Sequence, residues 1–291
     1  ENARLVMDLR RQNAENERLN EELTAANVQL ARLDQTKSDL IDIASHELRT
    51  PLTQIIGYNE ILEEMVAQDS LTVDAGLQMT GGVRRAAKRL EGIVDTMFDV
   101  SQLDTSSMEI VKSCVGVGSL IRGVLKGWEQ ALRERDQRVW TANLRELPMI
   151  EADRGGLRKV FSHLIQNAIK FTPDGGTIRV EGRVLGADGP VENRAVEIVV
   201  TDSGIGIAEE HLDRIFDSFY RAADVMRHSS GRTSFKGGGP GLGLAIARGI
   251  VQVHGGRIWA ESAGCDEEEC PGAAFHVLLP VDDSGWREGL A

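Results

Sequence analysis

The chain has 291 residues, a formal net charge of −12 and 41% hydrophobic residues. This length favours about two domains, and the acidic balance argues against a nucleic-acid binder, which needs basic residues to replace counterions on phosphates. Three cysteines are too few for a disulfide framework, which favours a reducing, cytoplasmic compartment. No apolar run is long enough to span a membrane, so we expect no direct membrane contact. The chain begins at Glu1 within a helical pattern, which we interpret as a fragment whose upstream sensor domain is missing.

Residues 1–36 carry a heptad pattern, with mostly apolar residues recurring at alternating steps of four and three. This spacing is typical of a coiled-coil seam. Gln12 and Asn16 interrupt the seam, and buried polar groups at such positions fix the register at a cost in stability. The alternative is a single amphipathic helix packed on its own domain. We favour a coiled-coil signalling helix, because no later segment is needed to cover the seam.

Residues 37–107 are expected to form an antiparallel helical hairpin, with a turn near residues 68–74. The first helix contains Pro51, which has no N–H for the carbonyl of Glu47 and should bend the helix. The second helix carries one apolar face: Val83, Ala86, Ala87, Leu90, Ile93, Val94, Met97 and Phe98. Because two helices are too thin to bury their own apolar stripe, we predict a homodimer in which two hairpins form a four-helix bundle.

From about residue 108 the pattern changes to short β-like runs between amphipathic helices. Strands are expected at Glu109–Lys112, Arg138–Asn143, Thr177–Leu185, Ala195–Thr201, Gly256–Glu261 and Ala273–Leu279. Helices are expected at Val117–Arg133, Arg154–Lys170 and Leu242–His254. This order predicts an α/β sandwich over residues 108–282, with helices layered on a mixed sheet. The whole chain is therefore an α+β multidomain protein, and residues 283–291 are expected to be a loose tail.

A histidine motif lies on the first helix of the hairpin, in the string Ser45-His46-Glu47-Leu48-Arg49-Thr50-Pro51-Leu52. The apolar residues around it can face inward, which leaves His46 facing water. An unprotonated ring nitrogen is a nucleophile near neutral pH, and Glu47 can accept from the other ring nitrogen and fix the tautomer. Thr50 lies one turn further on the same face. A lone histidine would be interpreted as a surface residue, but the full string resembles the H-box of sensor histidine kinases.

A second motif lies on the helix that follows Asp153, a candidate N-cap. His163, Asn167 and Lys170 share a face of this helix. An amide oxygen can ligate Mg²⁺ and a lysine can meet a phosphate. The run from His163 to Thr172 resembles the N-box of the same family, in which asparagine usually stands at the position of His163.

A third motif, Asp202-Ser203-Gly204-Ile205-Gly206, follows a predicted strand. A carboxylate at a strand end can accept from an exocyclic amine, while Gly204 and Gly206 let the backbone approach a flat base. The motif resembles the G1 box, whose aspartate binds the adenine amino group. The segment Ile215-Phe216-Asp217-Ser218-Phe219-Tyr220-Arg221 resembles the F-box, with packing phenylalanines and an arginine, Arg221, that can reach a phosphate.

A fourth motif is the glycine-rich run Gly237-Gly238-Gly239-Pro240-Gly241-Leu242-Gly243-Leu244. Backbone N–H groups of such a loop can crowd a phosphate at the start of the helix that follows. The run resembles the G2 box, and the candidate nucleotide-binding residues are Gly239, Gly241, Leu242, Gly243 and Leu244. Pro240 stands where the family usually has threonine, serine or alanine, which removes one N–H. The polar stretch between Arg221 and Gly237 is predicted to be a mobile lid over the nucleotide.

The resemblance covers about residues 36–281 and implies a histidine-phosphotransfer hairpin followed by an ATP-binding domain of the Bergerat type, similar to those of DNA gyrase and MutL. It implies that ATP binds with adenine on Asp202 and Mg²⁺ on Asn167, while Lys170 and Arg221 balance the phosphate charge. The γ-phosphoryl group then passes to His46 and onward to an aspartate of a response regulator.

The Glu-x-x-Thr pattern of Glu47 and Thr50 implies, by the same resemblance, a water positioned to dephosphorylate the regulator. Three alternatives stay open: an ATPase machine on the same nucleotide fold, which needs no histidine hairpin; a non-catalytic dimerising scaffold, which His163 and Pro240 leave open; and a serine or threonine kinase. Cys265 and Cys270 flank an acidic stretch that is either a metal site or a solvated loop. We favour the loop, because two thiols alone make a poor zinc site.

Overall fold

The computed structural model describes residues 47–104, 110–186, 194–220 and 241–281, together with isolated helical positions before residue 46. The predicted phosphoacceptor His46 lies outside the described residues, and so do Arg221, Gly239, the predicted lid and the tail. Most of the predicted coiled coil also lies outside them. The chain divides into two compact units, residues 1–87 and 88–291, and the division falls inside one long helix.

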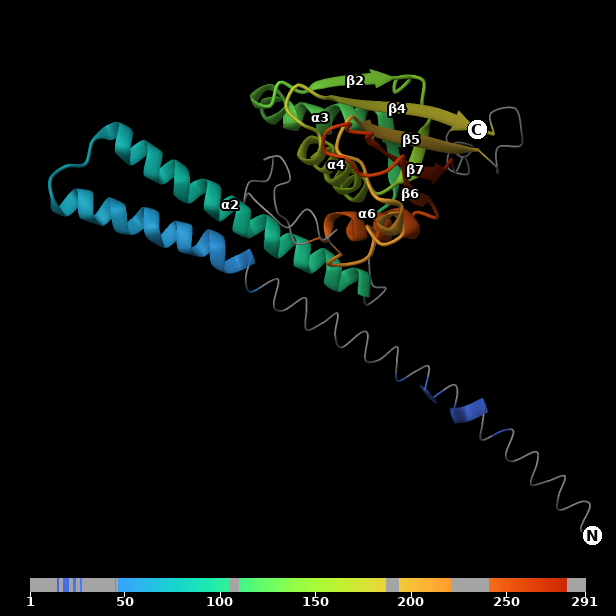
Figure 1. Cartoon of the computed structure of the whole chain (residues 1–291), viewed down its shortest axis with the longest axis horizontal. Helices are drawn as coiled ribbons and strands as arrows, with labels where there is room; N and C mark the ends of the chain where they lie inside the picture. Colours follow the sequence, from blue (N-terminus) through green and yellow to red (C-terminus); the bar gives the residue numbers. More distant parts are fainter. Residues whose placement is uncertain are drawn as a thin grey trace, which may run out of the picture. The chain divides into compact units, whose positions relative to one another are not determined.

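The helical hairpin has a first helix over residues 47–67, a turn at 68–69, and helix α2, Val73–Asp104 (Figure 1). The predicted turn is confirmed, and the first helix continues without interruption through Pro51. Gly82 allows close approach of the two helices, because a Cβ at this position would lie 2.5 Å from the ring of Tyr58. None of the helices in the described ranges is long and apolar enough to cross a membrane.

Large apolar side chains remain exposed along the described part of the hairpin. Leu52 is 49% exposed and Ile56 50% exposed on the first helix, while on α2 Val94 is 52% and Phe98 64% exposed. Ala86 and Ile93, which belong to the same predicted face of α2, are buried. One copy of the hairpin therefore leaves a substantial part of the predicted apolar face in contact with water.

The α/β domain contains a five-stranded sheet with the order β2-β4-β5-β7-β6. Its strands are β2 (Arg138–Ala142), β4 (Thr177–Leu185), β5 (Ala195–Asp202), β6 (Arg257–Ser262) and β7 (Ala273–Pro280). The β2–β4 pair is parallel and the other pairs are antiparallel, which confirms the predicted mixed sheet. The predicted strand positions are correct to within a residue or two for these five.

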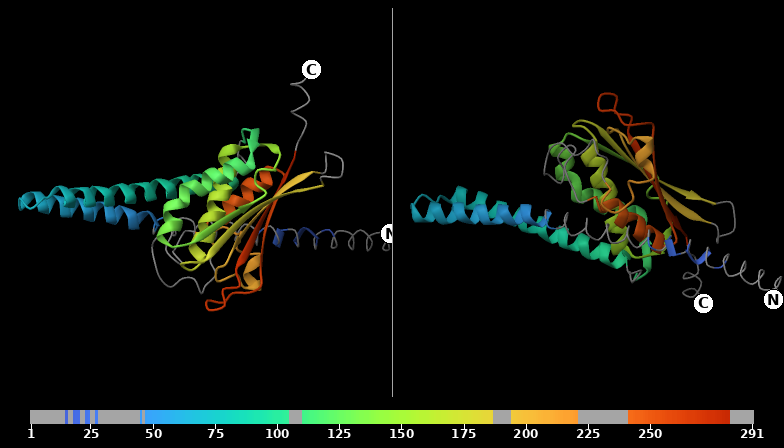
Figure 2. Two further views of the ribbon diagram at one scale, coloured as in Figure 1. Left: turned by 90° about the horizontal axis from the view of Figure 1, so that it is seen from above. Right: turned by 60° about the horizontal axis from the view of Figure 1, so that its bottom comes forward.

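Three helices, α3 (Val117–Glu134), α4 (Arg154–Phe171) and α6 (Gly243–Val253), cover one face of this sheet (Figures 1 and 2). Helix α4 begins where the sequence predicts, because the Asp153 side chain accepts a hydrogen bond of 2.8 Å from the N–H of Gly155. Its predicted inner face is fully buried: Leu157, Val160, Phe161, Leu164, Ile165, Ala168 and Ile169. The core of the domain therefore lies between α4 and the sheet.

One predicted strand is wrong. Residues 110–112 are not in a strand; the strand here is β1, Ser113–Gly116, and it pairs with β3, Met149–Ala152, in a separate two-stranded sheet. Val111 is 78% exposed, whereas Val115 is completely buried. The apolar pair Ile110-Val111 therefore does not extend the core, since Val111 faces water and Ile110 is only half-buried. Strand β3, which supplies the pairing, was missed because it is a run of four residues directly after Pro148.

Candidate nucleotide site

Asp202 lies at the end of the central strand β5, beside Ile178 of β4 and Ala273 of β7. The residue is only 6% exposed, and its Oδ1 accepts a hydrogen bond of 2.9 Å from the N–H of Gly204. Burial raises the pKa of the Asp202 carboxyl to about 6, and the hydrogen bonds from Gly204 and Ala273 oppose this rise. A buried carboxylate with spare acceptor capacity is suited to bind a ligand amine.

The loop after Asp202 touches the C-terminal end of α4. The N–H of Ile205 donates to the carbonyl of Phe171 over 3.2 Å. A Cβ at Gly204 would lie 2.4 Å from the same carbonyl oxygen and 2.6 Å from Oδ1 of Asp202. Only glycine fits this approach, so the structure joins the N-box and the G1 box directly.

The other end of the N-box touches the glycine-rich run. A Cβ at Gly243, the first residue of α6, would lie 2.9 Å from Nδ1 of His163. Gly241 has φ of +72° and its carbonyl accepts from the N–H of Phe219 over 3.1 Å. Leu242 is buried, whereas Gly243 and Leu244 are half-buried. The described part of the G2 box therefore adjoins both the N-box and the F-box.

Asn167 and Lys170 lie on α4 between these two contacts, and both are half-buried. The helix rises by about 1.5 Å per residue, so Phe171 and His163 are separated by about 12 Å along α4. The Nζ of Lys170 lies 4.8 Å from the centroid of the Phe171 ring. Asn167, Lys170, Gly204 and Gly243 thus follow one another along α4, with Asp202 at one end and the start of α6 at the other.

A magnesium ion is compatible with this surface. Mg²⁺ usually binds through one or two protein oxygens together with substrate phosphates and water. The amide oxygen of Asn167 could supply one such ligand, and Asn167 lies four residues after His163 and three before Lys170 on α4. Within the described ranges, no group of three or more histidine, cysteine or acidic side chains gathers to hold an ion.

Two residues missed by the sequence analysis fix the C-terminal end of α4. The buried Arg135 guanidinium donates to the carbonyl of Ile169 at 2.6 Å and of Thr172 at 2.9 Å, and it pairs with Asp174 at 2.7 Å. Gln137 Nε2 donates to the same two carbonyls. These donors satisfy the helix-end carbonyls and place positive charge at the negative end of the helix dipole. The partners are more than thirty residues apart, so no local sequence pattern reveals them.

His254 fixes the opposite end of α4. This residue is 6% exposed, and its Nε2 accepts from the N–H of Asp153 over 2.9 Å. Its Nδ1 therefore carries the proton and donates to the carbonyl of Ile250 over 2.7 Å. This neutral imidazole connects the C-terminal end of α6 to the N-cap of α4. The buried side chain of His254 thus fixes the end of α6 relative to the start of α4.

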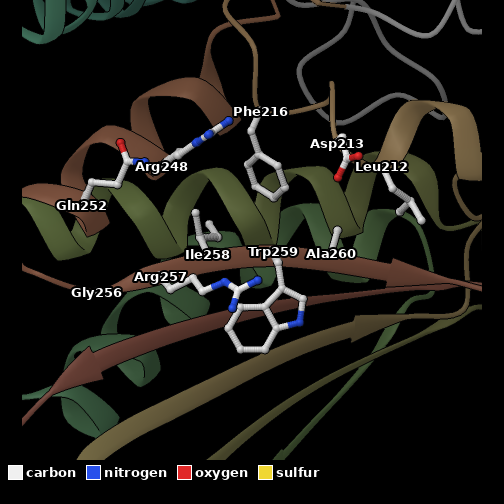
Figure 3. Close-up of a pocket in the computed structure, with 10 residues that line it drawn as sticks. All are labelled: Leu212, Asp213, Phe216, Arg248, Gln252, Gly256, Arg257, Ile258, Trp259 and Ala260. Carbon is white, nitrogen blue, oxygen red and sulfur yellow. The ribbon is translucent and has the colours of Figure 1, made fainter.

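Two further predicted site residues belong to the helical hairpin. Glu47 and Thr50 lie on the first helix of the hairpin, in the other compact unit. A pocket of about 340 Å³ beside β6 is lined by none of the residues predicted to bind the nucleotide or the metal (Figure 3). It is lined by Phe216, by Trp259 and Ile258 of β6, and by Arg248 and Gln252 of α6.

Two family models match the chain. The model for histidine kinase-, DNA gyrase B- and HSP90-like ATPases matches residues 152–283. The model for the His Kinase A phospho-acceptor domain matches residues 36–106. The first range contains the surface around Asp202, and the second contains His46.

Curated sensor protein kinases are similar to this chain over most of its length. The sensor protein kinase WalK of Staphylococcus haemolyticus is 34% identical over 264 residues, which cover 88% of this chain and 39% of the relative. WalK of Staphylococcus aureus is 33% identical, with 88% of this chain and 57% of the relative covered. The chain therefore spans well under two thirds of the length of these curated relatives.

Solved structures of histidine kinases are also similar to this chain. Full-length ShkA in complex with AMPPNP has a TM-score of 0.57 and 25% identity, covering 84% of this chain and 46% of that chain. Histidine kinase ThkA in complex with the response regulator protein TrrA has a TM-score of 0.51 and 25% identity, covering 82% and 60%. The histidine kinase AdeS of Acinetobacter baumannii, at 19% identity and a TM-score of 0.57, supports the fold alone.

Proposed function

The chain belongs to the sensor histidine kinases, and on that premise we propose that it is an ATP-dependent kinase core that phosphorylates its own His46. The observation that carries this proposal is the surface along α4, which joins the buried carboxylate of Asp202 to the start of α6. The match of the phospho-acceptor model to residues 36–106 supports His46 as the acceptor.

In the proposed complex, Asp202 accepts a hydrogen bond from the adenine amino group. Gly204 and Gly206 allow the backbone to lie against the base, and the triphosphate extends along α4 toward the glycine-rich run. Lys170 and Arg221 balance the phosphate charge, and the N–H groups at Gly239, Gly241, Leu242, Gly243 and Leu244 surround it at the start of α6. Mg²⁺, held by Asn167 and the phosphates, would neutralise charge on the transferring group.

The proposed transfer is an in-line displacement. The unprotonated ring nitrogen of His46 attacks the γ-phosphorus, the bond to the bridging oxygen breaks, and ADP leaves. Glu47 accepts a hydrogen bond from the other ring nitrogen and keeps the attacking nitrogen unprotonated. The catalytic contribution of the protein is mainly positioning and electrostatic stabilisation. The phosphoryl group then passes from His46 to an aspartate carboxylate of a response regulator, and Glu47 and Thr50 orient a water that later removes it.

The proposed active form is a homodimer in the cytoplasm, controlled through the coiled coil by a sensor upstream. The exposed apolar side chains of the hairpin support the dimer, because a second hairpin would cover them. A Bergerat-type ATPase machine is not favoured, because such a machine needs no phospho-acceptor domain, whereas residues 36–106 match the model of one.

The main test is autophosphorylation with γ-labelled ATP and Mg²⁺. We expect label that is lost in acid and survives base, as phosphohistidine does, and we expect His46→Gln to remove it. A His46→Gln protein that keeps its label would disprove the acceptor assignment. Label that survives acid instead would indicate a serine or threonine kinase.

A second test concerns the nucleotide site alone. Asp202→Asn replaces one of the two acceptor oxygens by a donor group and should weaken ATP binding by at least about 100-fold, because the adenine amine then meets another donor. ATP affinity measured by calorimetry on the full chain checks this. Unchanged affinity would show that adenine lies elsewhere.

A further inference from the structure

Tyr220 precedes Arg221 in the F-box run, and the proposed reaction gives its side chain no part. Its hydroxyl lies 2.7 Å from Nδ1 of His211, nine residues earlier in the chain. The guanidinium of Arg214 lies 4.3 Å from the centroid of the Tyr220 ring, and a cation over an aromatic face attracts it. The ring of this half-buried tyrosine is therefore held by two side chains of one short segment.

The segment that supplies these contacts is connected to the core of the α/β domain. His211 belongs to the short helix α5, Glu209–Leu212, and its carbonyl accepts from the N–H of Ile215 over 2.9 Å. Phe216, the next residue, is 7% exposed, and its ring centroid lies 6.4 Å from that of Phe275 on β7. His211 is thus tied to the sheet through the turn that follows it.

The backbone beside the Tyr220 ring contacts the glycine-rich run. The N–H of Phe219 donates to the carbonyl of Gly241 over 3.1 Å. A Cβ at Gly241 would lie 2.9 Å from the carbonyl oxygen of Tyr220 and 3.0 Å from the carbonyl carbon of Phe219. Phe219 has φ of +65°, a left-handed conformation that a residue other than glycine keeps only where its surroundings enforce it. A shift of residues 219–220 would therefore move Gly241 or break this contact.

Gly241 directly precedes the start of α6, where the proposed phosphates bind. Leu242 is the N-cap residue of α6; it is 2% exposed, and its carbonyl accepts from the N–H of Ile246 over 2.9 Å. The N–H groups of a first helical turn have no partner within the helix, so the place where the helix begins decides where they point. The contact of Gly241 with residues 219–220 therefore fixes the phosphate end of the candidate site.

We propose that Tyr220 and His211 are positioning residues for the triphosphate of ATP. Their hydrogen bond holds residues 219–220 against Gly241, and thereby holds the N–H groups at the start of α6 in place for the phosphates. This inference rests on the proposed nucleotide site, and neither side chain needs to touch the nucleotide. The hydroxyl can donate to an unprotonated Nδ1 or accept from a protonated one, so the contact persists in both states of His211.

The adenine end of the candidate site depends on other contacts. The N–H of Gly204 donates to Asp202 over 2.9 Å, and the next residue donates to the carbonyl of Phe171 over 3.2 Å. Neither of these two contacts involves the F-box. Loss of the Tyr220–His211 hydrogen bond should therefore weaken the binding of the phosphates and leave the binding of adenine unchanged.

The experiment compares the unaltered full chain with Tyr220→Phe and His211→Ala. Tyr220→Phe keeps the ring and removes only the hydroxyl. ATP affinity is measured by calorimetry with Mg²⁺, and adenosine affinity by ligand-observed NMR. We expect each substitution to weaken ATP binding by about fivefold, the effect of losing one hydrogen bond, and to leave adenosine affinity unchanged. A side chain with only a structural role would weaken the binding of both ligands alike.

The double variant tests whether the two side chains act as a pair. Both substitutions break the same hydrogen bond, so the double variant should lose no more ATP affinity than the weaker-binding single variant. If the two losses multiply instead, Tyr220 and His211 act separately, and the proposed pair is wrong.

The matched control is Tyr58→Phe, the same change at the other tyrosine of the chain, which lies on the hairpin and should leave both affinities unchanged. Unchanged ATP affinity in Tyr220→Phe overturns the inference, and so does an equal loss of affinity for ATP and adenosine. Adenosine binding that is absent from the unaltered chain, or that survives Asp202→Asn, overturns the proposed nucleotide site itself. Adenosine binding that depends on Asp202 confines any failure to the positioning role.

Discussion

In the helical hairpin, side chains such as Ile56, Val94 and Phe98 are at least half exposed, although they lie on an apolar pattern. In the α/β domain, the inner face of α4 and the facing side chains of β4, β5 and β7 are completely or almost completely buried. The α/β domain is a complete folding unit, whereas the hairpin has apolar surface that only a second element can cover. The difference supports the proposal that the hairpin is the part that dimerises and that a single chain can form the nucleotide site.

The largest expected effect is on the dimer. Val94→Asp places a carboxylate on the exposed apolar face of α2, and each dimer would bury two unpaired charges at a cost of several kcal/mol. We expect the full chain to change from dimer to monomer in sedimentation experiments. Val253→Asp is the matched control, because Val253 of α6 is similarly exposed, at 42%, but belongs to the α/β domain. A dimer that tolerates Val94→Asp would contradict the proposed interface.

The next largest expected effect is a loss of folding stability in the α/β domain. Gly204→Ala should destabilise it by about 3 kcal/mol, because the added methyl group meets the backbone of Phe171. This corresponds to a fall in the unfolding temperature of roughly 6–12 °C. The comparison variant is Gly123→Ala on α3, where a Cβ meets nothing within 4 Å. Gly123→Ala should stabilise the domain by about 0.5–1 kcal/mol, since alanine is the better helix former. Equal effects of the two substitutions would show that the contact with Phe171 is not tight.

The smallest effect is the pH dependence of Asp202. Its pKa of about 6 lies above the ordinary value of 3.8 because the carboxyl is buried, so the folded state binds this proton more tightly than the unfolded state. The buried carboxylate therefore costs stability above pH 6, and the cost decreases as the pH falls below 6. Relative to Asp202→Asn, the unfolding free energy of the unaltered protein should rise by up to about 1.4 kcal/mol per pH unit below 6. Denaturant titrations between pH 5 and 8 test this, and parallel pH profiles would refute it.

The sequence predicted most of the α/β domain because its periodicity reflects burial. Helix α4 has an apolar residue at every inward position, and β4 alternates over most of its length. In β5 the apolar residues Val196, Ile198 and Val200 are buried at every second position, although Glu197 between them is buried too. The small sheet of β1 and β3 was not predicted, since its strands have only four residues each and long-range pairing decides where they lie. Local patterns do not contain that pairing.

The residues of the candidate site likewise fall into those that the sequence predicted and those that it did not. Asp202, Gly204 and Gly243 lie in motifs that a single sequence reveals, and the structure brings their elements together around α4. Arg135, Gln137 and His254 were not predicted, because their role depends on carbonyl and N–H groups far away in the sequence. The assignment of His46 rests on its motif and on the family model, and it remains a proposal.

The close contact between His163 and Gly243 restricts how this protein can change by mutation. Because a Cβ at position 243 would lie 2.9 Å from the imidazole of His163, any larger residue at 243 must wait for a change in the side chain at 163. If the residue at 163 is replaced by a smaller one first, the intermediate variant has a small cavity beside Gly243 and no steric clash. Position 163 is therefore expected to act as a permissive site, and libraries that randomise 243 alone should recover mostly glycine.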